Sequence, residues 1–386
     1  MGQIVAAMAT MHAPQLFTRP PEEDQDKLEA GIAAMRKLGR LLDETKPDVL
    51  VIFASDHMET FFLKSVPTFC IVAGERARAE FAGRSWDLPI HRVFAEATLD
   101  GLVRRDFDMC YSQDAVLGHS FAAPFEWVLG GRNIPVVPFF VNTYLPPLTT
   151  ARRAAALGEA IADIVKSRPE RVALLASGGM SHYPGTWKYY SPAFDFDHWC
   201  IRELENGHSE SFLRLTPEQL DEVGNTEMLP WAPVLGAVRE QHMELLSYQE
   251  TAHHGHAVAV FHPGEKTDAR PPQPFQFHNH PYHFYDHPPV ASYRLNKLLY
   301  EARYKPTLRL RMFEDVEAVA AEYGLDREDT EALRDVFQFR YLNTETPALD
   351  AEPLVARGAH PVGALMAVHV LQQEQRKFSH AEVYLG

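Results

Sequence analysis

Four histidines occupy positions where side chains can do chemistry, directly after apolar strand-like runs or in tight turns. His12 and His57 each follow an apolar run, His119 lies in a turn, and His182 ends a glycine-rich loop at 177–182. Histidine is the commonest metal ligand and the side chain that titrates near neutral pH. Because the carboxyl ends of parallel strands meet at one edge of a sheet, the four side chains are expected to share one cleft.

A metal centre needs a carboxylate as well. Two neutral imidazoles and one carboxylate, with open coordination positions, form the ligand set typical of non-haem Fe(II) enzymes that use O₂. Glu227 stands just before an apolar segment, while Asp56 and Glu59 flank His57. An acidic residue in a first helical turn is also favoured by the helix dipole, so Glu227 has a purely structural interpretation too. Spacing alone leaves the choice among the three carboxylates open.

The elements that must position these residues alternate between apolar runs and amphipathic segments. This rhythm predicts an α/β fold, a large sheet domain flanked by helices. Predicted strands lie at 4–11, 49–53, 107–111, 135–141, 171–176 and 258–261, and predicted helices at 25–42, 92–105, 123–129, 150–166 and 220–243.

The composition changes after the last predicted strand. Prolines and histidines without periodicity fill 263–289, which indicates a linker or a surface arm. Helical spacing of apolar residues then predicts a small all-α C-terminal domain. We therefore expect a catalytic domain at 1–262, an arm at 263–292 and a helical domain at 293–386.

Composition limits the class of protein. The 386 residues carry a net charge of −15, without a basic stripe that could grip a phosphate backbone, so no nucleic-acid partner is expected. Three distant cysteines argue against a disulfide framework and favour a reducing, cytoplasmic compartment. No basic n-region opens the chain and no apolar run approaches 18 residues, so neither a signal peptide nor a membrane association is expected.

Four short motifs carry a resemblance to a known family. They are Thr10–Pro14, Ser55–His57, Leu117–Ser120 and Gly178–His182. In this order they resemble the motif series of the class III extradiol ring-cleaving dioxygenases, the LigB superfamily, which includes the protocatechuate 4,5-dioxygenase β subunit. The resemblance covers about residues 1–262. The helical tail resembles the small α subunit of the same enzymes, and one chain joining both parts is similar to gallate dioxygenase.

The resemblance implies roles for five residues. His12, His57 and Glu227 match the ligands of the catalytic Fe(II). His182 matches the histidine that takes a proton from the substrate hydroxyl and returns it later. His119 matches the second histidine of the pocket, near substrate and O₂. The tail would act as a lid over the active site.

One stretch departs from the family pattern. Where relatives carry small polar residues near the substrate, this chain has His253-His254-Gly255-His256. His253 and His256, three positions apart beside a strand, are the expected substrate-binding residues of this stretch. A second histidine-rich stretch at 277–283 has no counterpart and is interpreted as a surface arm.

The sequence thus predicts an Fe(II)-dependent dioxygenase that opens the ring of a small catecholic acid, such as protocatechuate or gallate, with O₂. It is expected to form a homo-oligomer, a dimer or larger. One alternative is cleavage of a hydroxypyridone by the same chemistry. Another is a metal-binding interaction protein similar to the Memo branch of the superfamily, and a third is a zinc hydrolase that uses the same ligands.

Overall fold

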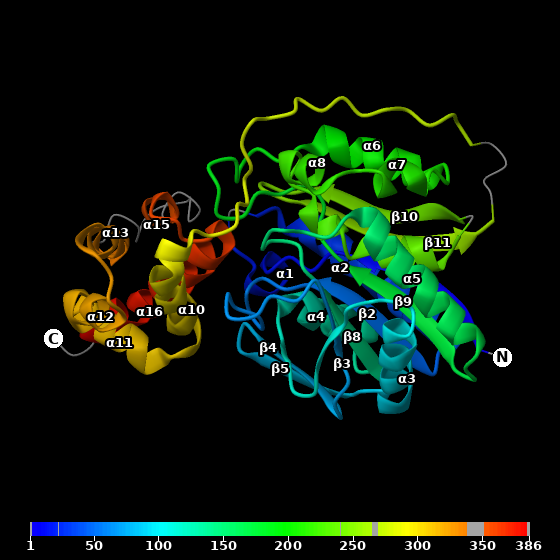
Figure 1. The fold of residues 1–386 in the computed structure, drawn as a ribbon, viewed down its shortest axis with the longest axis horizontal. Helices are drawn as coiled ribbons and strands as arrows, with labels where there is room; N and C mark the ends of the chain where they lie inside the picture. Colours follow the sequence, from blue (N-terminus) through cyan, green and yellow to red (C-terminus); the bar gives the residue numbers. More distant parts are fainter. Residues whose placement is uncertain (1, 22, 240, 265–268, 338–350, 384–386) are drawn as a thin grey trace. The chain divides into compact units, whose positions relative to one another are not determined.

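The computed structural model describes residues 2–21, 23–239, 241–264, 269–337 and 351–383. The chain divides into two compact units (Figure 1). The first comprises 1–182 and 192–283, and the second comprises 183–191 and 284–386. The proposed subdivision into catalytic domain, arm and lid stays a prediction.

An eight-stranded mixed sheet forms the centre of the first unit. Its strand order is β10-β11-β1-β9-β2-β8-β3-β6. The bounds are β1(Gln3–Thr10), β2(Val49–Ser55), β3(Phe69–Val72), β6(Cys110–Ser112), β8(Val136–Val141), β9(Arg171–Ser177), β10(Gln241–Glu250) and β11(Gly255–Pro263). The strands β1, β9, β2 and β8 are parallel neighbours. Every residue of β2 and β8 is buried, which explains why these strands have continuous apolar sequences.

Helices flank this sheet, as predicted (Figure 1). They are α1(Gln15–Thr18), α2(Gln25–Thr45), α3(Arg92–Val103), α4(His119–Ala123), α5(Ala151–Lys166), α6(Phe194–Glu205), α7(Ser209–Leu213), α8(Pro217–Glu222) and α9(Trp231–Ala237). The helix predicted at 123–129 begins earlier, at His119, and widens into a π-helical turn, η1(Pro124–Leu129). A separate small sheet, of β4(Arg76–Phe81), β5(Arg84–Pro89) and β7(Val116–Leu117), was not predicted.

The prediction of one helix at 220–243 is wrong. The segment holds the end of α8, the 3₁₀ turn η2(Thr226–Met228), helix α9 and the start of strand β10. Pro230 precedes α9 and Pro233 lies in its first turn, where a proline costs no helical hydrogen bond. Strand β10 lies at the edge of the sheet and carries many polar residues, so its sequence lacks the apolar run of a central strand.

The second unit is helical, and the prediction of a small all-α region is confirmed. Its elements are η3(Val290–Ser292), α10(Tyr293–Tyr304), α11(Pro306–Glu314), α12(Val316–Tyr323), α13(Arg327–Phe337), α15(Glu352–Ala356) and α16(Pro361–Val383). Leu298, Val319, Leu333 and Val368 belong to its own apolar core. Across the described residues, none of the helices has the length and apolar character needed to cross a bilayer.

The sheet brings four loops to one edge. The register pairs Thr10 of β1 and Ala54 of β2 with Ser177 of β9, so these three parallel strands end at the same level. Strand β11 runs antiparallel to β1, and its amino end therefore meets the carboxyl end of β1. The loops that follow β1, β2 and β9 and the loop that precedes β11 thus lie together, and they carry most of the predicted site residues.

Candidate metal centre

Glu227 lies between His12 and His57 at this edge. Its Oε2 is 3.2 Å from Nε2 of His12, and its Oε1 contacts Nε2 of His57. Ser55, the last residue of β2, donates a hydrogen bond to Oε1 at 3.2 Å. All three predicted metal ligands are buried, Glu227 completely. Burial alone would raise the pKa of Glu227, but the Coulombic effects of His12 and His57 outweigh it and hold the pKa well below its usual value.

Hydrogen bonds fix which nitrogen of His12 faces Glu227. Ser177 donates its hydroxyl proton to the carbonyl of Ser120 at 2.6 Å, so its oxygen accepts the Nδ1–H of His12 at 3.1 Å. In the tautomer that binds a metal, with the proton on Nδ1, the lone pair of Nε2 faces a carboxylate oxygen. Two facing lone pairs repel unless a proton or a metal cation lies between them. This buried set of two nitrogens and one carboxylate, with a hydrogen bond behind His12, fits a divalent ion such as Fe(II).

The two competing carboxylates have other contacts. Asp56 accepts hydrogen bonds from the backbone N–H groups of Glu59, Thr60 and Phe61 at 2.9–3.1 Å, which shapes the loop that carries His57. Burial raises the pKa of Asp56 to about 6. Glu59 contacts His119 instead of lying between the two histidines, as Glu227 does.

His119 is the amino-terminal residue of α4 and faces the same cluster. Its Nδ1–H donates to Glu59 at 3.0 Å and its backbone N–H donates to the same carboxylate at 3.2 Å. A Cβ at residue 118 would lie 1.5 Å from Oε2 of Glu59, so a side chain there would displace the carboxylate that holds His119. One ring nitrogen from each of His12, His57 and His119 lies within 4.8 Å of the others.

His182 lies in the loop after β9 and also approaches Glu227. Its Nδ1–H donates to the Met180 carbonyl at 2.7 Å, and its Nε2 is 3.4 Å from Glu227 Oε2. Burial lowers the pKa of His182, which favours the neutral ring. The hydroxyl of Tyr144 donates to Nε2 at 2.9 Å. Tyr144 was not predicted, although it comes three residues after the predicted strand 135–141, at the same sheet edge.

His254 belongs to the histidine stretch singled out in the sequence, but it was not one of the two expected substrate-binding residues. Its ring is stacked on that of His182, and it belongs with His182 and Glu227 to a group that could hold a metal ion. A Cβ at Gly179 would lie 2.1 Å from Nε2 of His254 and 3.0 Å from Oε2 of Glu227. The glycine-rich loop after β9 therefore leaves room for both side chains. Burial holds the pKa of His254 well below its usual value.

The two predicted substrate-binding residues have different surroundings. His253 accepts a hydrogen bond from Gln15 at 2.7 Å on Nε2 and contacts Glu23 through Nδ1 at 2.9 Å, so both ring nitrogens are engaged. His256 is buried beside His254, with ring centroids 4.5 Å apart. Within the part of the chain that the structure describes, the buried Nε2 of His254 and both nitrogens of His256 have no hydrogen-bond partner. Buried polar atoms of this kind are rare, and these nitrogens can bond to a water or to a ligand.

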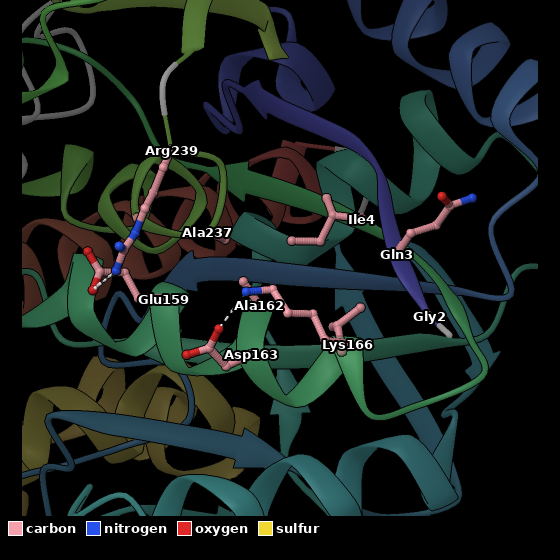
Figure 2. Close-up of a pocket in the computed structure, with 11 residues that line it drawn as sticks. Gly2, Gln3, Ile4, Glu159, Ala162, Asp163, Lys166, Ala237 and Arg239 are labelled. Carbon is pink, nitrogen blue, oxygen red and sulfur yellow. Dashed lines mark hydrogen bonds and ion pairs between the residues drawn. The ribbon is translucent and has the colours of Figure 1, made fainter. Parts of the chain in front are cut away.

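A cavity of about 430 Å³ lies elsewhere in the same unit, beside the first residues of β1 (Figure 2). Lys166 pairs with Asp163 at 2.8 Å and Arg239 pairs with Glu159 at 2.6 Å on its wall. The histidines lie at the other end of β1. The charged groups of this cavity are paired with one another, and it takes no part in the histidine cluster.

Comparison with known proteins identifies a family model. The model described as the catalytic LigB subunit of aromatic ring-opening dioxygenase matches residues 6–262. This range includes every residue of the histidine cluster.

Named relatives match a shorter stretch. A 2,3-dihydroxyphenylpropionate/2,3-dihydroxicinnamic acid 1,2-dioxygenase from Klebsiella pneumoniae (strain 342) is 35% identical over 175 residues, which are 45% of this chain and 55% of that protein. The protein of the same name from Escherichia coli O139:H28 is 34% identical over 175 residues, again 45% of this chain and 55% of that protein. The chain thus spans about half the length of these relatives. A crystal structure of the uncharacterized protein JW3007 from Escherichia coli K12 has 16% identity and a TM-score of 0.45, covering 66% of this chain and 99% of that one. That likeness is too distant to bear on function.

Proposed function

The chain belongs to the LigB family of catalytic subunits of aromatic ring-opening dioxygenases, and on this basis we propose that it is an Fe(II)-dependent extradiol dioxygenase. It would open a dihydroxylated aromatic ring by inserting both atoms of O₂. The observation that carries the proposal is the buried carboxylate of Glu227 between two imidazole nitrogens, with the neutral His182 3.4 Å away.

In this proposal His12, His57 and Glu227 hold the metal. When bound, Fe(II) would supply open coordination positions at which the substrate and O₂ could meet. Ser177 keeps Nδ1 of His12 protonated, so Nε2 is the nitrogen that binds. Ser55 orients the carboxylate of Glu227.

Proton transfer falls to His182 and His119. The Met180 carbonyl holds the proton of His182 on Nδ1, so Nε2 is free to accept a proton from a substrate hydroxyl. In the absence of substrate this nitrogen accepts the hydroxyl of Tyr144. His119 is oriented by Glu59 in the same tautomer, with Nε2 as its second functional atom.

The proposed substrate is a small catecholic acid, with protocatechuate and gallate as first candidates. The named relatives are called 2,3-dihydroxyphenylpropionate/2,3-dihydroxicinnamic acid 1,2-dioxygenases, and this name supports a catecholic acid as the substrate class. A hydroxypyridone is a second candidate because the neutral rings of His254 and His256 can both donate to a ring carbonyl and accept from a ring N–H. His256 is the proposed substrate-binding residue with free hydrogen-bonding capacity. His253, the other one proposed, would have to exchange its bond to Gln15 for the substrate.

The test is anaerobic reconstitution of the full chain with Fe(II), followed by O₂ uptake with protocatechuate, gallate, 2,3-dihydroxyphenylpropionate and a hydroxypyridone. The expected result is one O₂ consumed per ring and a ring-opened product, with the Zn(II)-loaded protein inactive. Metal binding without O₂ uptake would favour a Memo-like interaction protein, and hydrolysis supported by Zn(II) would favour a zinc hydrolase. Light scattering of the same preparation tests the proposed homo-oligomer.

A further inference from the structure

Asp197 is a completely buried carboxylate on α6, outside the set of residues assigned above to metal, proton transfer or substrate. Its Oδ1 accepts hydrogen bonds from the backbone N–H of Ser181 and from the side-chain amide of Asn225, both at 3.0 Å. Its Oδ2 accepts from the hydroxyl of Tyr248 at 2.9 Å and from the same Ser181 N–H at 3.2 Å. One carboxylate therefore joins three separate segments of the chain.

Two of these segments carry the reactive groups. Ser181 immediately precedes His182, and Asn225 lies two residues before Glu227. The segments are also joined directly, since the backbone N–H of His182 donates to the Gly224 carbonyl at 3.0 Å. The position of Asp197 therefore bears on the 3.4 Å separation between His182 Nε2 and Glu227 Oε2.

The same carboxylate meets the hairpin that carries the additional histidines. A Cβ at Gly255 would lie 2.0 Å from Oδ2 of Asp197, and Tyr248 belongs to the paired strand β10. Gly255 stands between His254 and His256. Asp197 thus lies where the His182 loop, the Glu227 turn and the β10–β11 hairpin meet.

Ser181, Asn225 and Tyr248 all donate hydrogen bonds to Asp197. A carboxylate, which has two acceptor oxygens, matches these three donors. We propose that Asp197 is a positioning residue of the active site, which fixes the spacing between the proton acceptor His182 and the metal ligand Glu227. The inference rests on the proposed function for the roles of these two residues. A carboxylate that served only as a fold-stabilising contact would change stability alone when it is replaced.

Two variants and one matched control separate these roles. Asp197→Ala removes both acceptor oxygens, and Asp197→Asn keeps one and introduces an N–H group that faces a donor. The control is Glu203→Gln on the same helix: Glu203 is also buried, but it accepts from Ser211 at 2.9 Å and from the Gln273 backbone at 3.2 Å, away from the two reactive loops. Each full-length variant is measured for thermal unfolding, for Fe(II) affinity under anaerobic conditions, and for kcat and KM at saturating metal.

The expected result is a fall of about 10-fold to 100-fold in Fe(II) affinity and in kcat for Asp197→Ala, the range typical of residues that orient metal ligands. Asp197→Asn should fall between Asp197→Ala and the wild type, with KM close to that of the wild type. Glu203→Gln should lower the unfolding temperature without these losses. If both Asp197 variants lost only stability, as the control does, the positioning role would be overturned. If the wild type bound Fe(II) but consumed no O₂, the proposed function would fail while the affinities still tested the role of Asp197.

Discussion

The imidazole of His254 stacks on that of His182, with ring centroids 3.8 Å apart and planes 17° from parallel. Burial lowers the pKa of both rings, so both are neutral in the resting protein and the stack involves no charge repulsion. In the proposed function His182 accepts a proton, and the face of a neutral His254 ring would then lie against the charged ring. His254 can therefore act in two ways that mutations can separate. Its ring face packs on His182, and its Nε2 can form a hydrogen bond.

Replacement of His254 separates these contributions. His254→Phe keeps a ring over His182 and removes Nε2, so kcat should stay within a few-fold while KM rises or the ranking of substrates changes, because a buried polar contact discriminates strongly. His254→Ala removes the ring as well and should lower kcat further. Steady-state kinetics on the catecholic acids and the hydroxypyridone measure both effects. Identical kinetics of the two variants and the wild type would exclude His254 from the site.

His182→Ala should leave Fe(II) content near that of the wild type and lower kcat by about 10²-fold to 10⁴-fold, the usual contribution of a general acid or base. Metal analysis and O₂ uptake are the measurements. His198→Ala is the control, since His198 is an exposed histidine paired with Glu250. Loss of iron in His182→Ala would mean that His182 is a ligand and that the division of roles is wrong.

Glu227→Gln should lose Fe(II), because an amide oxygen is neutral and a poorer ligand, and no carboxylate would then lie between His12 and His57. Equilibrium dialysis with Fe(II) under anaerobic conditions measures the loss. Glu244→Gln controls for the change of charge, since Glu244 is exposed and pairs with His262. Full iron content in Glu227→Gln would assign the carboxylate ligand elsewhere.

Gly179→Ala tests the close approach behind the cluster. The added methyl group would lie 2.1 Å from His254 Nε2 and 3.0 Å from Glu227 Oε2, so both side chains must shift. Fe(II) affinity should fall at least about 10-fold, which is the low end of the loss seen when residues that orient metal ligands are changed. In the control Gly101→Ala the methyl group meets only the side chains of Ile164 and Arg105, so the affinity should be unchanged. Equal affinities in both variants would contradict the geometry.

The pH dependence of stability reports on His256. Burial lowers the pKa of His256 from 6.5 to about 3, so below pH 6.5 the unfolded chain binds a proton that the folded chain does not. Its contribution to stability is therefore full above pH 6.5 and is lost as the pH falls toward 3. Relative to the wild type, His256→Leu should gain up to about 1.4 kcal/mol per pH unit in this window, measured by urea unfolding of the metal-free proteins. A stability difference that is constant with pH would show that His256 titrates normally.

The positions of the histidines could be predicted from the sequence better than the position of the carboxylate beside them, Glu227. His12, His57 and His182 follow strands whose apolar runs are plain, so their place at the sheet edge could be predicted. Glu227 lies in a 3₁₀ turn between short helices, which has no periodic signal, and its role was inferred from the family resemblance. The roles of His12, His57 and Glu227 as metal ligands and of His182 as a base stay predictions.

Other features depend on contacts between distant parts of the chain. Asp197 lies in the amphipathic helix α6, which contains several acidic residues. The local sequence does not show which of them is buried. Tyr144 and His254 meet His182 only after the sheet has formed. Strand β10 was missed because its stability comes from pairing with β11 at the edge of the sheet, while more than half of its sequence is polar.

The β10–β11 hairpin extends the sheet on the far side of β1 and ends in a four-residue tip, in which Thr251 donates two hydrogen bonds to the carbonyl of His254 at 2.9 and 3.0 Å. The proposed iron ligands come from other loops, those after β1 and β2 and the turn before α9. In the proposed function the hairpin supplies substrate contacts from a part of the sheet that carries none of the three metal ligands, and it meets the cluster through His254, which stacks on His182. If the proposed function holds, a change of substrate can be sought by varying His253 in the tip and His256 in β11 while His254 and Gly255 are kept, because the latter two contact the His182 loop and Asp197.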